Sequence, residues 1–492
     1  MNHGPTLRRH RGWVGKFLLI LLALAMLGVA VLFFLPGTSS ELQREAKIAA
    51  LARVGDVAVE RLAEASPDNH GSAVDFIRQP IEVREVAKDV FYATGVGNTV
   101  MVRTDDGVVI FDTGLVIQSA KQLQALRETV SDQPARYVVL SHSHADHVGG
   151  TRLWLTDSTQ LVAHEEFLEE QRYLTELDPY FHNRNRTLFP WMPAEPSKLG
   201  LLNFRDLVPD IEVDNDEPFT FMVGGKRFEA IAAPGAEGAD NLVLWLPDER
   251  ILLTGDFFGP QFPQFPNVFT MRGEKVRKPV EYIQSLDRLI ALEPEVVVPS
   301  HLAPAYGAEK IKQDMLRIRD AVQYVHDATV AGMNAGKTVY QLMQEIVLPE
   351  ELSLVQSHGK VSWAVRSIWE YYATWFHFRH STELYAVPID DVFEDIASLA
   401  GEARLLQLAD TYLTGNELEK ALHVLDIAAA GQDSAPVAAL RASVLQQLLE
   451  RARRTTANDY EIYWLNAQLE KAHSASSFAV TDEHSETFSQ PQ

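Results

Sequence analysis

The strongest constraint in this sequence is a cluster of metal-ligand side chains directly after an apolar run. The run Tyr137–Leu140 reads as a buried strand, and His142, His144, Asp146 and His147 follow within a few residues. Imidazole and carboxylate are ligands that zinc and similar divalent metals take in proteins. In extended chain His142 and His144 point to one side, whereas Asp146 and His147 follow where the chain turns and can face a second position. Four such residues at this spacing predict a metal site rather than chance histidines on a surface loop.

A site for two metals needs more ligands than this loop supplies, and three candidates follow apolar strands further along. They are Glu237, Asp256 and His301. An acid or a histidine directly after a buried strand lies at a sheet edge, where sites form, so we expect Asp256 and His301 to join the loop. For Glu237, the nearby Asp240 is an alternative in the same segment.

The surrounding pattern predicts a layered α/β domain. Strand, helix, strand and metal loop follow one another between residues 90 and 147, an order that favours α/β layers. Residues 171–205 are irregular and rich in aromatic residues, arginine and proline, so we expect a lid or a substrate-binding insertion there. Further strands are indicated at 90–94, 99–103, 108–111, 161–164, 219–223, 228–232, 242–246, 251–254 and 295–301, and a helix at 118–130.

After about residue 308 the pattern becomes helical almost to the end of the chain. The spacing of small and apolar residues between Ala409 and Leu425 suggests tetratricopeptide-like helix pairs, with ordinary helical packing as the alternative. The polar tail from Ser474 is expected to be disordered. Helices are indicated at 309–335, 339–347, 350–358, 360–378 and 388–398, with shorter ones to 454.

The N-terminus carries a basic stretch followed by an apolar run. The uncharged run Phe17–Leu35 has about the length that a membrane helix needs, and no clear cleavage site follows it. With arginines before it, this run predicts an uncleaved single-pass anchor with a cytoplasmic N-terminus and a periplasmic or extracellular catalytic domain. A cleaved signal peptide is the alternative. Residues 41–66 then predict a juxtamembrane helix.

Charge and cysteine content exclude several classes of function. The formal net charge of −23 and the lack of a basic stripe beyond the N-terminus argue against a nucleic-acid partner. The chain has no cysteine, which excludes disulfides, thiolate ligands and a cysteine nucleophile. At 492 residues, 46% of them hydrophobic, the chain is long enough for two or three domains with a sizeable core.

The loop at residues 142–147 resembles the metal-binding signature of the metallo-β-lactamase superfamily. This resemblance implies an αββα sandwich with the site at one edge, between two sheets. Most of that superfamily uses a histidine as the third ligand of the first metal, but no histidine occurs between His182 and His301. Glu237, in the sequence Pro-Gly-Ala-Glu, is similar to the corresponding glutamate motif of the alkylsulfatase branch.

Further segments resemble the same branch. Residues 267–277 are similar to the segment that helps hold the sulfate, and segments between 324 and 352 and at 458–465 are similar to the helical dimerisation domain. Two features depart from the branch: Asp256 stands where a glutamate usually bridges the metals, and residues 357–360 read Ser-His-Gly-Lys where the branch often has a glycine-tyrosine loop. The sterol-carrier-like C-terminal domain of many alkylsulfatases is not expected here.

The resemblance also implies roles for the site residues. Two divalent ions against three carboxylates leave a small positive charge, which favours an anionic ester as substrate. Asp146 and Asp256 are the expected catalytic residues, and arginine suits tetrahedral oxyanions. The implied set is His142, His144 and Glu237 for the first metal, Asp146, His147 and His301 for the second, Asp256 bridging or close to both, and Arg272 with Asn267 and Thr270 for the sulfate.

These observations combine into one prediction. The fold class is an α/β metallo-β-lactamase αββα sandwich followed by an all-α, partly tetratricopeptide-like domain, with an N-terminal transmembrane helix. The function is a di-zinc hydrolase that cleaves alkyl sulfate esters with a metal-bound hydroxide and forms a homodimer. The alternatives are another hydrolase of this fold, acting on lactones, thioesters or phosphodiesters, and a non-catalytic membrane-anchored interaction protein. The predicted parts are an anchor at 1–40, a helix and linker at 41–84, a catalytic domain at 85–307, a dimerisation domain at 308–473 and a tail at 474–492.

Overall fold

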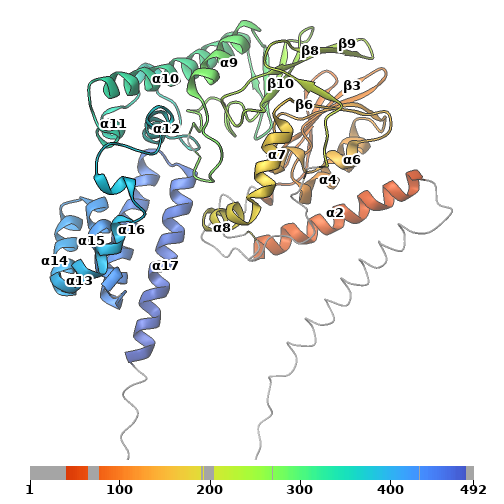
Figure 1. The fold of residues 1–492 in the computed structure, drawn as a ribbon. Helices are drawn as coiled ribbons and strands as arrows, with labels where there is room; N and C mark the ends of the chain where they lie inside the picture. The colour runs from red at the N-terminus through yellow and green to blue at the C-terminus, as the bar shows by residue number, and fades with distance from the viewer. Residues whose placement is uncertain are drawn as a thin grey trace, which may run out of the picture.

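The computed structural model describes residues 40–64, 77–189, 192, 204, 206–268, 270–431 and 433–483. In these residues the chain forms two stacked sheets flanked by helices, followed by a helical domain (Figure 1). This arrangement confirms the predicted αββα sandwich and the helical domain after it.

The first sheet has seven strands in chain order. Its first four strands are antiparallel and β4 to β7 are parallel, because helices return the chain to the same edge between them. The carboxyl ends of β4 and β5 therefore meet at one edge. The strands are β1 (Val83–Ala87), β2 (Val90–Ala93), β3 (Thr99–Thr104), β4 (Gly107–Phe111), β5 (Ala135–Val139), β6 (Gln160–His164) and β7 (Ile211–Val213).

The second sheet has six strands in the order β13-β12-β11-β10-β9-β8. Only β11 and β12 are parallel, and α9 (Pro279–Ala291) connects them, so their carboxyl ends also lie side by side. The strands are β8 (Phe219–Val223), β9 (Lys226–Ala232), β10 (Leu242–Leu246), β11 (Ile251–Gly255), β12 (Val296–Pro299) and β13 (Ala305–Tyr306).

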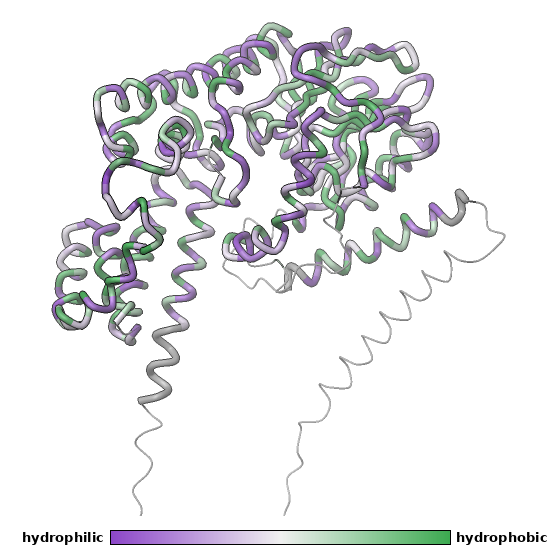
Figure 2. Tube along the Cα trace, in the orientation of Figure 1, coloured by the Kyte–Doolittle hydropathy of each residue, from purple (hydrophilic) through white to green (hydrophobic). Residues whose placement is uncertain are grey.

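The core lies between the two sheets and beneath the helices that cover them. Alternate strand residues such as Val100 and Leu244 face the space between the sheets. On the outer face of the first sheet, Leu123 of α4 (Val116–Thr129) and Ile110 belong to one buried hydrophobic cluster. Hydrophobic residues accordingly concentrate in the strands of the sandwich, whereas hydrophobic and hydrophilic residues alternate along the covering helices (Figure 2). This layering leaves one sheet edge open for the residues that follow β4, β5, β11 and β12.

Helix α2 (Ser40–Glu64), predicted as a juxtamembrane helix, packs along α4 as an outer layer of the sandwich. Ile48 is buried in the core beneath the first sheet. Lys121 Nζ lies 2.7 Å from Asp56 Oδ1, and Arg44 Nη2 donates to the carbonyl oxygen of Leu153 at 2.7 Å. The helix is therefore part of the folded body.

The prediction of a transmembrane anchor is corrected. Among the residues that the structure describes, no helix is both long enough and apolar enough to cross a bilayer. The 27-residue α10 (Ala308–Asn334) has the length, but charged residues recur along it. The predicted span, Phe17–Leu35, lies outside the described residues. We therefore withdraw the anchor from the fold class, together with the membrane partner and the single-pass membrane location that depended on it.

The helical domain has two parts. The first, α10 to α12, shares a core with α9 and the outer face of the second sheet, while α13 to α17 pack around a core of their own. Helix α17 continues to Glu483, so residues 474–483 are helical where a disordered tail was predicted, and 484–492 lie outside the described residues. The remaining helices are α11 (Val339–Glu345), α12 (Val361–Ala373), α13 (Phe393–Ala400), α14 (Glu402–Thr414), α15 (Leu418–Gly431), α16 (Ala435–Thr455) and α17 (Asp459–Glu483).

Much of the segment predicted as irregular forms two helices, α7 (Phe167–Glu176) and α8 (Asp178–Leu188). Few residues of α8 are apolar, so the sequence offered no helical periodicity there. Helix α8 contacts α17 of the helical domain.

Candidate active site

The ligand loop runs from the end of β5 into the short helix α5 (Ala145–Val148). His142 and His144 lie in extended chain before α5, and Asp146 and His147 lie within its single turn. This change of conformation points the two pairs of side chains to two neighbouring positions, as the spacing predicted.

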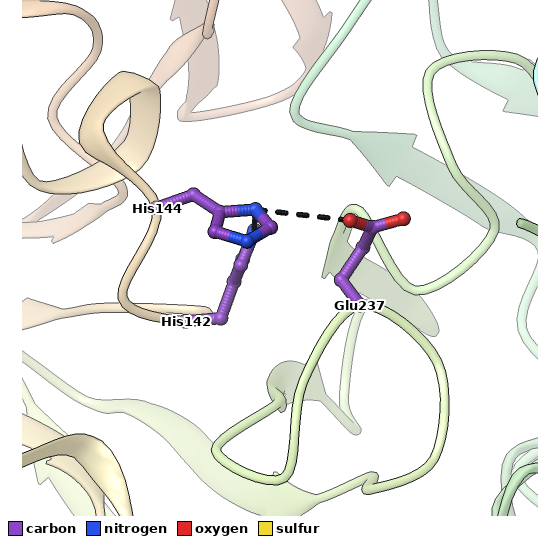
Figure 3. A group of neighbouring side chains, drawn as sticks. All are labelled: His142, His144 and Glu237. Carbon is purple, nitrogen blue, oxygen red and sulfur yellow. Dashed lines mark hydrogen bonds and ion pairs between the residues drawn. The ribbon is translucent and has the colours of Figure 1, made fainter. Parts of the chain in front are cut away.

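The first position brings together His142, His144 and Glu237 (Figure 3). His142 Nε2 lies 2.8 Å from His144 Nδ1, which lies 3.7 Å from Glu237 Oε2. The candidate ligand atoms of the three residues are all within 4.8 Å of one another. Glu237 comes from the loop between β9 and β10, so both sheets contribute to this position.

The second position brings together Asp146, His147 and His301. Asp146 Oδ2 lies 3.7 Å from His147 Nε2 and 3.5 Å from His301 Nε2. Asp256 follows β11 and lies between the two positions: its Oδ2 is 3.5 Å from His147 Nε2, its Oδ1 is 3.0 Å from His301 Nε2, and it also groups with His142. All seven predicted ligands thus gather at one sheet edge, and their role as ligands stays a prediction.

Asp112, directly after β4, supports this cluster and was missed as a site residue. Its carboxylate accepts hydrogen bonds from His147 Nδ1 at 2.8 Å, from Ser300 Oγ at 2.5 Å, and from the backbone N and Oγ of Ser141, both at 2.8 Å. The Ser141 hydroxyl uses its one hydrogen to donate a hydrogen bond to Asp112. Its oxygen therefore accepts a hydrogen bond from His142 Nδ1 at 2.9 Å. Both histidines are therefore held with Nε2 facing the site, the arrangement that metal-ligating histidines need. The sequence feature that could have identified Asp112 is an acid at the end of a buried strand, which is the feature that identified Asp256.

The residues present fit a divalent cation. His147 Nε2 is buried and forms no hydrogen bond with any residue that the structure describes, although Asp256 Oδ2 lies 3.5 Å from it. Burial lowers the pKa of His147, but the carboxylates of Asp256, Asp146 and Asp112 outweigh it and raise that pKa well above its ordinary value. Burial likewise opposes ionisation of Asp256, yet the imidazoles of His301 and His147 hold its pKa well below the usual range. The pocket between these side chains therefore favours positive charge, which a metal ion supplies.

Two arginines and a second glutamate surround Glu237. Arg277 donates to Glu237 Oε1 at 2.8 Å and to Oε2 at 2.9 Å, and it donates to Glu274 Oε2 at 2.9 Å. Arg272 Nη2 donates to Glu237 Oε2 at 3.4 Å, and Glu274 Oε2 lies 3.4 Å from His144 Nε2. Each carboxylate oxygen has two lone pairs, so the contacts of Glu237 with arginine leave room for a metal. Arg277 and Glu274 were not predicted as site residues. The only sequence feature that marks them is the alternation of charged residues after Met271.

The other predicted substrate-binding residues lie in the same loop. The backbone oxygen of Asn267 accepts from Arg277 Nη1 at 2.6 Å, while its buried side-chain amide forms no hydrogen bond within the described part of the chain. The side chain of Thr270 accepts from the backbone N of Arg272 at 3.3 Å and so shapes the loop. These contacts bring Asn267 and Arg272 to the Glu237 cluster, with Thr270 behind them.

Asp240, the alternative to Glu237, is not among the grouped ligands. It is buried, and burial, reinforced by the charge of Glu170, raises its pKa to about 7. The geometry therefore favours Glu237 over Asp240 as the acid of the first position.

The helical domain also reaches this cluster. His358, in the loop before α12, places Nε2 4.0 Å from Glu237 Oε1, and burial lowers its pKa to about 4, with Arg272 and Arg277 adding to the effect. The ring of Tyr460 at the start of α17 packs on His358 with centroids 5.1 Å apart. Residues far along the chain thus cover the side of the site that holds Glu237.

Comparison with known proteins agrees with this architecture. Residues 92–301 match the metallo-beta-lactamase superfamily, and residues 338–472 match the alkyl sulfatase dimerisation family. A linear primary-alkylsulfatase of Pseudomonas sp. (strain ATCC 19151) is 30% identical over 339 residues, which are 64% of this chain and 63% of that protein. An alkyl/aryl-sulfatase of Saccharomyces cerevisiae, BDS1, is 22% identical over 323 residues, 59% of this chain and 49% of that protein. The chain therefore spans less than two thirds of the length of these relatives.

Among solved structures, the stereoselective inverting sec-alkylsulfatase Pisa1 from Pseudomonas sp. has the same fold. The TM-score is 0.68 at 20% sequence identity, and the match covers 80% of this chain and 66% of that one. The chain thus joins a metallo-beta-lactamase domain to an alkyl sulfatase dimerisation domain, a combination that fits the alkylsulfatase-like branch of that superfamily.

Proposed function

We propose that this protein is a di-zinc hydrolase that cleaves alkyl sulfate esters to an alcohol and sulfate. The observation that carries the proposal is the pairing of Glu237 with Arg272 and Arg277 beside a histidine-carboxylate cluster. A glutamate in that place, held by two cations, gives the site a metal position and an anion position side by side. The alkylsulfatases among its relatives support the same substrate class.

Zinc suits the donor set of imidazoles and carboxylates. His142, His144 and Glu237 would hold one ion, and Asp146, His147 and His301 the other, with Asp256 shared between them. When bound, zinc lowers the pKa of water and polarises oxygen atoms of an ester.

The side chains of this chain would bind, orient and move a proton. Arg272 would bind the sulfate oxygens through its guanidinium fork. Arg277 keeps Glu237 in place, and Asp112 keeps His147 in the tautomer that the site needs. The Asp146 side chain is 26% exposed and that of Asp256 only 10%, so Asp146 faces incoming solvent and its carboxylate can orient the attacking water and accept a proton from it.

The test is metal analysis of the purified chain combined with a substrate panel. The panel holds a primary and a secondary alkyl sulfate, a lactone, a thioester and a phosphodiester. We expect bound zinc and release of inorganic sulfate. Turnover of only the lactone, thioester or phosphodiester would move the assignment to another hydrolase of this fold. A protein without bound metal and without turnover would contradict both hydrolase assignments.

We also propose that the chain forms a homodimer through the helical domain. The match to the dimerisation family supports it, as does the segment from the end of α12 to the end of α13, which exposes large apolar side chains. These side chains include Tyr371, Trp375, Phe378, Tyr385, Ile389 and Leu399, and Phe378 is 87% exposed.

Light scattering of the full chain tests the homodimer. The expected mass is twice the chain mass of 55.0 kDa. The double variant Trp375→Ser/Phe378→Ser should shift the protein toward the monomer, because it removes two exposed aromatic anchors. The matched control is Met222→Ser, which changes an exposed apolar residue on β8. A monomeric wild type, or equal behaviour of the two variants, would contradict this interface.

A further inference from the structure

Alternate residues of the segment 271–275 contact different parts of the molecule. Arg272 Nη2 donates to Glu237 Oε2 at 3.4 Å, and Glu274 Oε2 lies 3.4 Å from His144 Nε2, so both side chains reach the first metal position. The residues that alternate with these two contact helices α7 and α8 instead; they are Met271, Gly273 and Lys275. The α7–α8 insertion, residues 167–188, therefore lies against the segment that carries Arg272.

Lys275 connects this segment to α7. Its Nζ donates to Glu170 Oε1 at 2.8 Å and to Glu169 Oε1 at 3.2 Å, and it lies 4.6 Å from the centre of the Tyr173 ring. Glu170 is only 4% exposed, so the ammonium group compensates a carboxylate that has lost most of its hydration. A hydrogen bond to a buried charge holds its partners more firmly than an ion pair between two exposed side chains does.

The residue after Glu170 fixes α7 to the ligand loop. Gln171 is buried, and its Nε2 donates to the carbonyl oxygen of Ser143 at 2.5 Å. Ser143 stands between the two histidines of the first metal position. Because neighbouring side chains of α7 hold the ligand loop and Lys275, this helix sets the separation between the ligand loop and the segment 271–275.

Arg184 of α8 makes the second connection. Its Nε donates to the carbonyl oxygen of Met271 at 3.0 Å, and its Nη1 donates to Tyr180 Oη at 3.1 Å. Gly273 has a φ of +80°, and a Cβ at this residue would lie 2.9 Å from Arg184 Nε, so glycine suits both the conformation and the close approach. Arg184 thus contacts the residues on both sides of Arg272.

Helix α8 is itself held from the helical domain. Phe189 directly follows α8, and its ring lies 6.2 Å from the ring of Tyr460 and 6.1 Å from the ring of Tyr463, between centroids. Both tyrosines belong to α17. The insertion is therefore fixed by the ligand loop at one helix and by the helical domain at the other.

We propose that the α7–α8 insertion positions Arg272 beside the first metal position, with Lys275 and Arg184 as positioning residues that act through Arg272 and not on the substrate. The role of Arg272 as the residue that binds the anionic group, and the identity of that group as sulfate, rest on the proposed function. A backbone held on both sides of Arg272 leaves the guanidinium less freedom to lose when it binds an oxyanion.

The experiment measures oxyanion binding and kinetics in the full, zinc-loaded chain. The decisive variant is Arg184→Ala, because Arg184 is exposed and its removal leaves no charge buried. Lys275→Gln is the second variant, and Arg272→Ala is the reference that lacks the positioned group. Zinc content and thermal midpoint are measured first. Calorimetric titration then gives the Kd for inorganic sulfate and for inorganic phosphate, and steady-state kinetics give KM and kcat for a primary alkyl sulfate.

Three further variants serve as matched controls. Arg186→Ala removes another exposed arginine from α8. Lys278→Gln removes a lysine that pairs with α9 instead of α7. Lys275→Arg keeps the positive charge and should restore most of the affinity that Lys275→Gln loses.

We expect Arg184→Ala and Lys275→Gln each to raise the Kd for sulfate and the KM by about fivefold, the usual effect of losing one hydrogen bond. The value of kcat should change little, because Arg272 contacts the anionic group equally in the ground state and the transition state. Zinc content should match that of the wild type. Arg186→Ala and Lys278→Gln should bind sulfate as the wild type does, and Arg272→Ala should bind it most weakly.

Unchanged Kd and KM in both Arg184→Ala and Lys275→Gln would overturn the inference and leave the proposed function intact. An equal loss in Arg186→Ala, or a loss of zinc from Arg184→Ala, would also overturn it, since either result indicates a structural role only. The inference fails as well if Arg272→Ala binds oxyanions as tightly as the wild type. If both variants weaken oxyanion binding but the wild type hydrolyses no sulfate ester, the proposed function fails and this inference stands.

Discussion

The two halves of the candidate metal centre are held in place by different kinds of interaction. Asp112 holds the half that contains His147 through hydrogen bonds from serine hydroxyls, a backbone N–H and an imidazole, all inside the sandwich. Arg277 and Glu274 hold the half that contains Glu237, through ion pairs from a loop outside the sheets. The first half therefore depends on strand geometry, whereas the second depends on a balance of buried charges.

The largest loss of turnover should come from single variants that each remove one predicted metal ligand, one variant in each half of the centre. We expect Asp146→Ala and His144→Ala each to lower turnover by about 1,000-fold or more, because the metal contributes several kcal/mol to the transition state. Circular dichroism should show that the fold is largely kept. The control is Asp248→Ala, an exposed acid on the turn between β10 and β11. Full activity in either ligand variant would refute the site.

A smaller effect, on zinc affinity, is expected from changing Asp112, which supports the half that contains His147. Asp112→Asn replaces an acceptor of four hydrogen bonds, so the affinity for zinc should fall by about 10- to 100-fold, as is usual for groups that orient a ligand. Zinc titration against a chelator measures this change. Ser300→Ala removes only one of the four donors and should have a weaker effect. If Asp112→Asn binds zinc as tightly as the wild type, the supporting role of Asp112 is wrong.

The smallest effect should come from a charge-conserving change in the second half. Arg277→Lys keeps the positive charge but loses the paired contacts with Glu237, so we expect about tenfold weaker binding of only one of the two proposed zinc ions. The chelator titration should then separate into two steps. Lys278→Arg, on an exposed lysine of the same loop, is the matched control. Equal weakening of both ions would show that the two halves are not held independently.

Local sequence predicted much of the first half, since its ligands follow buried strands. The signal that identified Asp256 and His301 also applies to Asp112, yet a strand-end acid by itself does not reveal that four donors converge on it. Arg277 and Glu274 could not be chosen from the charged residues around them, because alternating charges are ordinary on solvated loops. Helix α8 was missed because its polar composition hides the helical period.

The sequence by itself determined the ligand types, the position of the loop after β5, the layered sandwich and the helical domain. These features follow from strand patterns and metal-ligand residues that each occupy a short stretch of sequence. Only the tertiary structure decided which distant groups complete the site. Ser300 meets Asp112 across 188 residues, Arg277 meets Glu237 across 40, and α2 packs on α4 as an outer layer of the fold. Such contacts depend on how sheets and loops are placed in space, and no local pattern encodes that placement.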